Sequence, residues 1–380
     1  MTKSKSNIFY IDQQSYGNLS VYDHSLLSRI DRGMEIHYFC NKLYDAGMLE
    51  QNIHFHKIFR YSGKQGLAKK ISYTLSVLQL LFFVILYSPK VIHQQWIKAT
   101  FLDLMIWKIS KRFFNTKIIY TAHNVLPHIG TTKSNDEYRK VYSVCDVIIS
   151  HTVTSQKELV ATFPETENKV QIIPHGVLDF NISQSEINQA KSSILQQYNL
   201  KGKLILGMFG FQSLYKGSDI ILKLWSDCPE LSANDNLRLL VIGKSEQNIL
   251  PASLPSNVIV VDEYLENAEF EAFMELTNVI LMPYRRIDQS GLLLTIANKK
   301  IPFCVSNVGE LTKPLEIADV GWSFPSLEAD DVKAKILEIV SSPDIISIKK
   351  ENAEGWQKVQ QYYDWSKSAI LTERLYKLYY

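Results

Sequence analysis

The sequence predicts an α/β protein built from two parallel-sheet domains in series, and three observations predict this fold class. Short apolar runs alternate with amphipathic stretches along most of the chain. The alternation is interrupted once, near the middle, and then restarts. A chain of 380 residues is long enough for two domains of ordinary size. A hydrophobic content of 46% with 21% charged residues is typical of a globular protein and argues against disorder.

The first domain is expected to cover residues 1–180. Its apolar runs have the length of buried parallel strands, at residues 7–11, 34–39, 90–93, 117–122, 146–150 and 169–174. Amphipathic stretches predict helices between these strands, at residues 20–31, 66–87, 100–113, 137–144 and 154–162. Strands that alternate with helical crossovers form a doubly wound parallel sheet.

The second half of the chain repeats this pattern after a polar stretch with helical spacing, residues 181–202, which is expected to be a connector. A second Rossmann-like domain is predicted for residues 203–343. Its strands are expected at residues 203–209, 237–243, 257–262, 278–283, 301–305 and 320–324, and its helices at 218–226, 268–277, 291–299 and 328–341. The tail, residues 344–380, is predicted to be helical and to pack back towards the N-terminal domain.

Charge is distributed unevenly between the two halves. The net charge of the whole chain is only +2, which does not favour a nucleic-acid partner. Residues 1–180 contain 21 Lys and Arg against 14 Asp and Glu, whereas residues 181–380 contain 20 against 25, and all nine histidines lie in the first half. This asymmetry suggests two domains with different tasks, the first of which faces an anionic surface.

The cysteines indicate the compartment. Cys40, Cys145, Cys228 and Cys304 are far apart and form no Cys-x-x-Cys pair. This spacing predicts free thiols in a reducing compartment and argues against a zinc site or a disulfide framework. No signal peptide is visible before the first strand-like run. We therefore expect a cytoplasmic protein.

Residues 71–87 form an almost uncharged apolar segment that follows Lys69 and Lys70. The segment is shorter than the roughly 20 residues that a membrane-spanning helix needs. It is either a crossover helix buried against the sheet or a helix that lies in a membrane interface. Together with the basic stretch 98–117, the second alternative would place the protein peripherally on the inner face of the plasma membrane.

A strand, loop, helix, strand pattern covers residues 282–311. Its loop carries Arg285, Arg286 and Asp288, and a Gln-Ser-Gly sequence ends at Gly291, where the helix begins. In an open parallel sheet, ligands bind at the loops that follow the carboxyl ends of strands. A glycine at a helix N-terminus lets backbone N–H groups approach an anion. The pattern therefore predicts a site for a phosphate-bearing ligand.

Six short motifs follow one another along the chain: TAHNVLPH (121–128), IIPHG (172–176), GFQSLYKGSDI (210–220), LRLLVIGK (237–244), PYRRIDQSGLLLTIANKKIPFCVSNVGEL (283–311) and DWSKSAILTERLYKLY (364–379). In this order they resemble the motifs of glycosyltransferase family 4, the glycosyltransferase group 1 proteins. The resemblance covers nearly the whole chain. It implies the GT-B architecture, in which two Rossmann-like domains face a central cleft and helices follow at the C-terminus.

The resemblance implies that the second domain binds a nucleoside-diphosphate sugar. Lys216 lies in a glycine turn between a strand and a helix, where its ammonium group would neutralise a diphosphate. Backbone amides near Ser290 would bind the same phosphates, and Arg285 would add a bidentate positive charge. The residues expected to bind the donor are Gly210, Lys216, Gly217, Tyr264, Arg285, Asp288, Gln289, Ser290 and Gly291.

Two positions depart from the family pattern. The family has a pair of acids eight residues apart, and alignment of the glycines places the first acid at Asp288 and the second at Ile296. An isoleucine cannot make the ribose contact of that second acid. Ser213 stands where a basic residue often precedes the lysine. These departures keep open a catalytically inactive GT-B subunit that acts as a membrane-docked partner.

The first domain is expected to bind the acceptor. His123 directly follows a strand, in a loop that resembles the acceptor-side loop of the family. The loop after the first strand is expected to line the acceptor entrance, and Asp23 or His24 would act as a base. The acceptor residues expected are Tyr16, Gly17, Asn18, His24, Asn124 and His128, and the catalytic residues expected are His123, Asp23 and Asp288.

These features predict a glycosyltransferase that moves a hexose from a UDP- or GDP-linked sugar to a hydroxyl of a glycan or lipid-linked glycan, in cell-surface polysaccharide assembly. The resemblance implies retention at the anomeric carbon, whereas a base at Asp23 would favour inversion. No Asp-x-Asp sequence occurs, so neither a metal nor another cofactor is expected besides the donor substrate. A UDP-sugar epimerase of the same architecture is an alternative.

Overall fold

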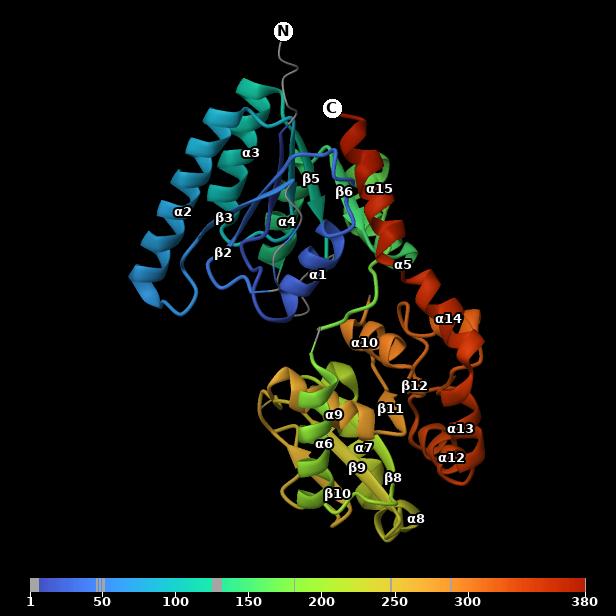
Figure 1. Cartoon of the computed structure of the whole chain (residues 1–380). Helices are drawn as coiled ribbons and strands as arrows, with labels where there is room; N and C mark the ends of the chain where they lie inside the picture. The colour runs from blue at the N-terminus through green and yellow to red at the C-terminus, as the bar shows by residue number, and fades with distance from the viewer. Residues whose placement is uncertain are drawn as a thin grey trace. The chain divides into compact units, whose positions relative to one another are not determined.

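The computed structural model describes residues 7–45, 47, 49, 52–124, 132–180, 182–246, 248–287 and 289–379, apart from the side chains of Asn18 and of residues 132–134. The chain forms two compact units, which we call unit 1 (residues 1–176 and 364–380) and unit 2 (residues 177–363). Each unit contains one parallel β-sheet with helices on its faces (Figure 1). The predicted class, two parallel-sheet α/β domains, is confirmed.

Unit 1 contains a sheet with the strand order β3-β2-β1-β4-β5-β6-β7. The strands are β1 (Ile8–Ile11), β2 (Ile36–Asn41), β3 (Ile53–Phe59), β4 (Val91–Gln94), β5 (Lys117–Thr121), β6 (Val147–Ser150) and β7 (Val170–Ile172). The helices are α1 (Asn18–Leu27), α2 (Gly66–Tyr87), α3 (Thr100–Phe114), α4 (Thr132–Val144), α5 (Val153–Thr162), the 3-10 turn η1 (Pro164–Lys169) and α15 (Trp365–Lys377).

Two apolar cores lie on opposite faces of this sheet. One is formed with α2, α3 and α4 and contains Val84, Trp107 and Tyr142. The other is formed with α1 and α15 and contains Leu26 and Tyr376. Successive residues of a strand point to opposite faces, so both faces of an all-parallel sheet must be covered, which explains why its strands are almost wholly apolar.

Unit 2 contains a sheet with the strand order β10-β9-β8-β11-β12-β13. The strands are β8 (Leu204–Phe209), β9 (Leu237–Ile242), β10 (Val258–Val261), β11 (Val279–Met282), β12 (Phe303–Val305) and β13 (Gly321–Ser323). The helices are α6 (Gln184–Gln197), the 3-10 turn η2 (Leu214–Lys216), α7 (Ser218–Asp227), α8 (Pro229–Ser232), α9 (Asn267–Leu276), α10 (Gly291–Lys299), α11 (Lys313–Ile317), α12 (Ala329–Val340), α13 (Pro343–Glu351) and α14 (Ala353–Tyr362).

The strand order reverses once in each sheet. In unit 1 it reverses between β1 and β4, and in unit 2 between β8 and β11. The connections on the two sides of such a point leave in opposite directions, so the loops at the carboxyl ends of these strands frame a crevice where open α/β sheets bind ligands. The fold thus singles out the loops that follow β8 and β11 in unit 2, which are the loops that the sequence singled out.

The boundaries of the compact units differ from the predicted domains. The stretch 181–202 is not a free connector, because α6 buries Ile187 and Ile194 in the core of unit 2. The tail divides between the units. Helices α13 and α14 belong to unit 2, where Trp356 is buried, and only α15 belongs to unit 1.

One strand of unit 1 was not predicted. β3 pairs with β2 at the edge of the sheet. Its middle residues, including His54 and His56, are exposed or half-buried, so the strand has no continuous apolar run. The described part of the first sheet therefore has seven strands, where the sequence predicts six.

Candidate functional site

The segment after β8, residues 210–217, is a tight turn that carries Lys216, and we call it the lysine turn. Gly210 and Gly217 both have positive φ angles, of 82° and 71°, which glycine adopts at little cost. Gly217 ends η2 and caps α7. A Cβ atom on Gly210 would lie 3.0 Å from the Nζ atom of Lys216. The glycines thus let the backbone turn back beside the ammonium group.

The lysine turn is fastened to the loop that follows β11. A side chain on Gly217 would overlap the carbonyl oxygen of Pro283. The backbone N–H of Arg285 donates to the carbonyl oxygen of Tyr215 at 2.7 Å. Because β8 and β11 are neighbours in the sheet, these contacts join the two loops that the reversal of strand order places together.

Lys216 carries a positive charge for which the described part of the chain supplies no ion pair or hydrogen bond. Its Nζ lies 5.6 Å from the centre of the Tyr284 ring. Burial lowers the pKa of Lys216 to about 8, and no carboxylate acts against this effect. The buried Oγ of Ser213, three residues earlier, also has no partner among the described residues. A half-buried cation in the same turn as an unpaired hydroxyl donor is suited to an anionic ligand.

The N-terminus of α10 completes this edge of unit 2. Ser290 is the N-cap of α10, and its side chain accepts a hydrogen bond from the backbone N–H of Leu293 at 3.4 Å. Burial raises the pKa of Tyr284, and its buried hydroxyl has no hydrogen-bond partner among the described residues. Gly291, the first helical residue, is exposed. Exposed N–H groups at a helix N-terminus attract anions.

Arg285 is placed differently from the prediction. Its guanidinium group binds the Asp219 carboxylate through two hydrogen bonds, of 2.6 and 2.7 Å, and also donates to the carbonyl oxygen of Leu214. The carboxylate raises the pKa of Arg285, and the guanidinium lowers that of Asp219. In this structure Arg285 therefore ties the loop to the lysine turn, and its contact with a phosphate stays a prediction. The sequence analysis did not identify Asp219.

The remaining predicted donor residues are more scattered. Gln289 is half-buried beside Ser290, and Tyr264, in the loop after β10, is 82% exposed. Asp288 lies outside the described residues. Ile296 is fully buried in the core of unit 2. The Ile296 side chain therefore packs α10 against the sheet.

In unit 1, His123 lies in a cluster of aromatic and imidazole rings at the carboxyl ends of the strands. The indole of Trp96 stacks on its ring, with centroids 4.5 Å apart, and its Nε2 is 3.0 Å from the Oε1 of Gln95. His151 lies 3.4 Å away, nitrogen to nitrogen. Burial lowers the pKa of His123 well below its usual value, so the ring is neutral near pH 7. A neutral imidazole can donate one hydrogen bond and accept another, but it carries no positive charge.

The residues that contact His123 were not predicted from the sequence. Gln95 and Trp96 directly follow β4, and His151 follows β6. Their positions at the carboxyl ends of strands, where ligands bind in parallel sheets, could have identified them. Asn124 is half-buried beside His123, and His128 lies outside the described residues.

Asp23 is not an accessible base, contrary to the prediction. Its carboxylate is completely buried and accepts hydrogen bonds from the hydroxyls of Tyr10, at 2.7 Å, and Tyr38, at 2.5 Å. Burial raises the pKa of both Asp23 and the neighbouring Asp12. A carboxylate enclosed by α1, β1 and β2 cannot reach a substrate.

The other acceptor residues lie at the start of α1. Tyr16 is half-buried, Gly17 is exposed with a φ angle of 54°, and Asn18 begins the helix. The Nδ1 of His24 is 3.3 Å from the hydroxyl of Tyr44, and burial lowers the pKa of His24. His24 is half-buried, so it remains the more accessible of the two predicted bases.

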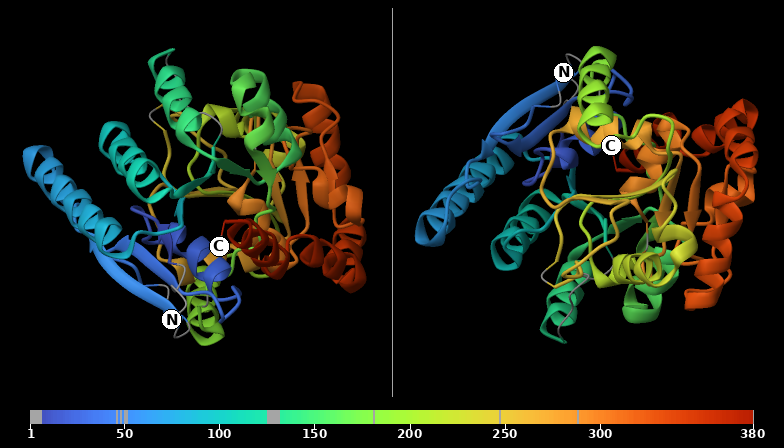
Figure 2. Two further views of the ribbon diagram at one scale, coloured as in Figure 1. Left: turned by 90° about the horizontal axis from the view of Figure 1, so that it is seen from above. Right: turned by 90° about the horizontal axis from the view of Figure 1, so that it is seen from below.

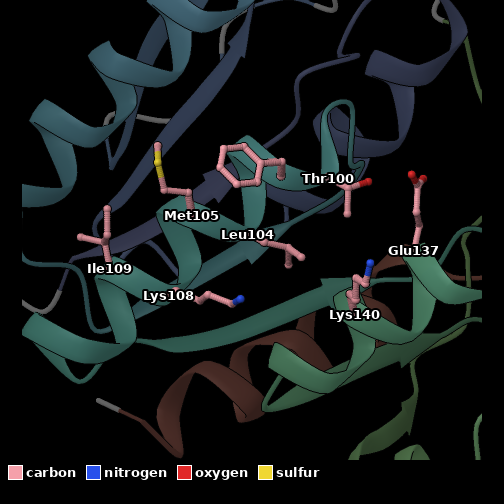
Figure 3. A pocket seen from close by; sticks show the side chains of 8 residues that line it. Thr100, Leu104, Met105, Lys108, Ile109, Glu137 and Lys140 are labelled. Carbon is pink, nitrogen blue, oxygen red and sulfur yellow. The ribbon is translucent and has the colours of Figure 1, made fainter.

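A separate hollow of about 450 Å³ lies between α3 and α4 of unit 1 (Figure 3). Its wall is mainly apolar, and Lys108 and Lys140 carry positive charge at its border. None of the predicted site residues lines it. The lining residues are Thr100, Phe101, Leu104, Met105, Lys108, Ile109, Glu137 and Lys140.

Comparisons with known proteins agree with this architecture. Residues 27–178 match the model of Glycosyltransferase Family 4. A search of curated proteins found no match. Sucrose-phosphate synthase from Thermosynechococcus elongatus superposes with a TM-score of 0.68 at 15% identity, covering 98% of each chain. HepE from Anabaena, solved with UDP-glucose, gives 0.67 at 14%, over 98% of this chain and 99% of the other.

A third similar structure is WaaG, a glycosyltransferase involved in lipopolysaccharide biosynthesis. It superposes with a TM-score of 0.64 at 13% identity, covering 96% of this chain and 98% of WaaG. At these identities the superpositions establish the fold. Residues 27–178 are thus similar to Glycosyltransferase Family 4, and the chain as a whole has the GT-B fold of these glycosyltransferases.

Proposed function

We propose that the protein is a glycosyltransferase that moves a hexose from a nucleoside-diphosphate sugar to a hydroxyl of a glycan or lipid-linked glycan in cell-surface polysaccharide assembly. The observation that carries this proposal is the ammonium group of Lys216, which has no ion-pair partner among the described residues and lies in a glycine turn at the reversal point of the second sheet. UDP is the preferred nucleotide, because HepE, which has the same fold, was solved with UDP-glucose.

The donor diphosphate would bind at the edge formed by the lysine turn and the N-terminus of α10. Breaking the bond between the sugar and the diphosphate leaves negative charge on the phosphate oxygens. The Lys216 ammonium and the N–H groups at Gly291 would stabilise this charge as it develops. Arg285 would act as a positioning residue, because its contacts with Asp219 and Leu214 hold the turn in place.

Unit 1 would bind the acceptor near His123 and the start of α1. The burial of Asp23 favours retention at the anomeric carbon, because the carboxylate predicted as an inverting base cannot reach a substrate. In a retaining transfer of this kind, a phosphate oxygen of the leaving group takes the acceptor proton. His123, neutral and held by Gln95, would orient hydroxyl groups.

We further propose that the reaction needs no metal and no cofactor besides the donor, because the charge of Lys216 takes the place of a divalent cation at the diphosphate. Turnover should therefore persist in excess EDTA. A cytoplasmic location is supported by the four cysteines, all buried free thiols.

The test is calorimetric titration with UDP, GDP and their hexose conjugates. Wild-type protein should bind one nucleotide class, and Lys216→Met should lose most of this affinity. Lys223→Met is the matched control, because Lys223 is exposed on α7, close in sequence to the lysine turn, and should leave binding unchanged. At a hundredfold excess over Kd, the ligand should stabilise the fold by about 2.7 kcal/mol.

Product analysis separates the proposal from its alternatives. A transferase consumes the donor in proportion to the acceptor glycosylated. An epimerase would convert one nucleotide sugar into another with no acceptor present. An inactive partner subunit would bind no nucleotide sugar, and this outcome would disprove the proposal. The loss of the family acid at Ile296 and of the basic residue at Ser213 makes this last measurement necessary.

A further inference from the structure

Helix α2 exposes a continuous apolar face, although its opposite face is packed in the core of unit 1. Seven large apolar side chains on this helix are 51–72% exposed. Their spacing of three or four residues places them on one side of the helix. We call this set the apolar stripe: Leu67, Ile71, Leu75, Leu78, Phe82, Ile85 and Leu86.

The inner face of α2 is fixed to the unit by buried polar and apolar contacts. The hydroxyl of Tyr73 donates to Asp103 at 2.6 Å, and that of Ser76 donates to the carbonyl oxygen of Ile58 at 2.7 Å. Val77 and Val84 are buried in the core. Withdrawal of the helix from the sheet would leave these polar groups unpaired.

Among the described helices, α2 alone is long and apolar enough to cross a membrane. Its 22 residues extend over about 33 Å. Because one face is held against the sheet, the geometry allows only the other face to enter an apolar medium. The helix therefore lies along a surface and does not span it.

Helix α3 packs beside α2 (Figures 1 and 2). Figure 2 shows α2, in light blue, at the outer edge of unit 1 with α3 next to it. On α3, Phe101 and Phe113 are 80% and 70% exposed, and Phe101 also lines the hollow between α3 and α4. Exposed apolar area of this kind marks a surface that meets another apolar phase.

The segment that carries the apolar stripe is predominantly basic, although Lys111 and Lys117 at its end pair with Asp146. Residues 60–117, which contain α2 and α3, include ten Lys and Arg and a single acid, Asp103. Asp103 is buried and accepts hydrogen bonds from Tyr73 and Gln13, so its charge does not face outwards. Lys69, Lys70 and Arg112 are exposed. The surface thus combines an apolar stripe with positive charge.

We infer that α2 and α3 form a docking surface for an anionic lipid bilayer, on which α2 lies parallel to the membrane with the apolar stripe in the acyl region. Lysine and arginine side chains beside the stripe would contact lipid phosphates. A second copy of the chain fits this surface less well, because two such faces would bring their basic residues together. The inference is independent of the proposed transferase activity, because it concerns binding without a nucleotide.

Vesicle sedimentation tests this surface directly. The full chain is mixed with vesicles of phosphatidylcholine alone, or of phosphatidylcholine with phosphatidylglycerol. We expect binding to the anionic vesicles that weakens as salt is raised, and weak binding to the neutral ones. Leu75→Glu with Phe82→Glu should lower the partition coefficient at least tenfold. Both positions are exposed, and glutamate is a good helix former, so the fold should persist.

The matched control is Ile348→Glu, which replaces an exposed apolar residue of α13 in unit 2 and should leave vesicle binding unchanged. Lys69→Ser with Lys70→Ser tests the charge and should reduce binding to anionic vesicles only. Two results would overturn the inference: no binding of the wild type to anionic vesicles, or equal binding by the Leu75 and Phe82 double variant. Loss of a dimer in that variant, with vesicle binding unchanged, would instead assign the stripe to a second copy.

Discussion

Gly217 of the lysine turn lies directly against the carbonyl oxygen of Pro283, in the loop after β11, with no room for a side chain between them. This contact joins the two loops at the reversal point of the second sheet. The Lys216 ammonium group of this turn lies 5.6 Å from the centre of the Tyr284 ring, in the same loop after β11. The position of the charge in the candidate donor site therefore depends on a glycine.

Gly217→Ala should weaken both the fold and nucleotide binding. The φ angle of 71° alone costs an L-residue about 1–2 kcal/mol. The collision with Pro283 adds to this cost and displaces the lysine turn. Urea denaturation measures the free energy of unfolding, and calorimetry measures the nucleotide Kd.

Gly202→Ala is the control for this variant. Gly202 has the same φ angle of 71°, in the turn before β8, but a Cβ there would meet no atom within 4 Å. Gly202→Ala should lose stability through the same backbone strain, and its nucleotide affinity should be unchanged. If the two variants lost equal stability and bound nucleotide equally well, the contact with Pro283 would have no role in the site.

Nucleotide affinity should fall as the pH rises above about 8. Burial lowers the pKa of Lys216 to about 8, so the free protein loses its positive charge above that pH, whereas a bound diphosphate holds the proton on. The Kd should therefore rise by up to roughly tenfold per pH unit between pH 8 and 9. Titrations at several pH values measure this slope.

Lys216→Arg distinguishes a pH dependence of Kd that comes from Lys216 from one that comes from titration of the nucleotide itself. Arginine stays charged over this range, so its Kd should change less with pH than that of the wild type. A wild-type Kd that is constant from pH 7 to 9 would show that Lys216 does not contact the phosphates.

Much of the fold was predictable because its signal is local. The apolar segment of α2 predicts a helix at residues 66–87, and the structure places it there. The edge strand β3 was missed because exposure of its middle residues breaks the apolar run. The stretch 181–202 looked like a connector because most of its residues are polar. Helix α6 in this stretch buries Ile187 and Ile194 in a core, and two such residues give only a weak apolar signal.

The candidate site was predictable only where it is local in sequence. The lysine turn and the start of α10 each carry their own glycine pattern. The pairing of Arg285 with Asp219 joins residues 66 positions apart, and nothing near either residue indicates it. The burial of Asp23 depends on Tyr10 and Tyr38, which come from two different strands. Such contacts are decided by the packing of the sheet.

Asp23→Asn should lower stability and leave the catalytic rate of the folded protein nearly unchanged. The carboxylate accepts hydrogen bonds from two tyrosine hydroxyls in the core. An amide would accept these bonds less well, which should lower the free energy of unfolding by about 1–3 kcal/mol. Removal of a catalytic base would instead lower kcat by a factor of about 100 or more. A transfer assay well below the melting temperature distinguishes the two results. A hundredfold loss of kcat with unchanged Kd would restore Asp23 as the base.

Acidification should destabilise unit 1 through its buried histidines. Burial lowers the pKa of His93 and His175 to about 3 and that of His151 to about 4, and His123 is also lowered. The unfolded chain takes up protons below about pH 6.5, where the folded state does not. Stability should therefore be full above pH 6.5 and fall towards pH 4, by about 1.4 kcal/mol per pH unit for each histidine. Asp23 acts in the opposite direction, because its raised pKa favours the folded state at low pH.

His175→Asn isolates one histidine, because asparagine is polar and does not titrate in this pH range. The difference in unfolding free energy between pH 7 and pH 5 should shrink by roughly the share of one group, about 2 kcal/mol. Ile149→Val is the control, because it removes a buried methylene and no titrating group, and should lower stability equally at both pH values. An unchanged pH slope in His175→Asn would mean that the pKa of this imidazole is nearly the same in the folded and unfolded protein, so burial would not lower it.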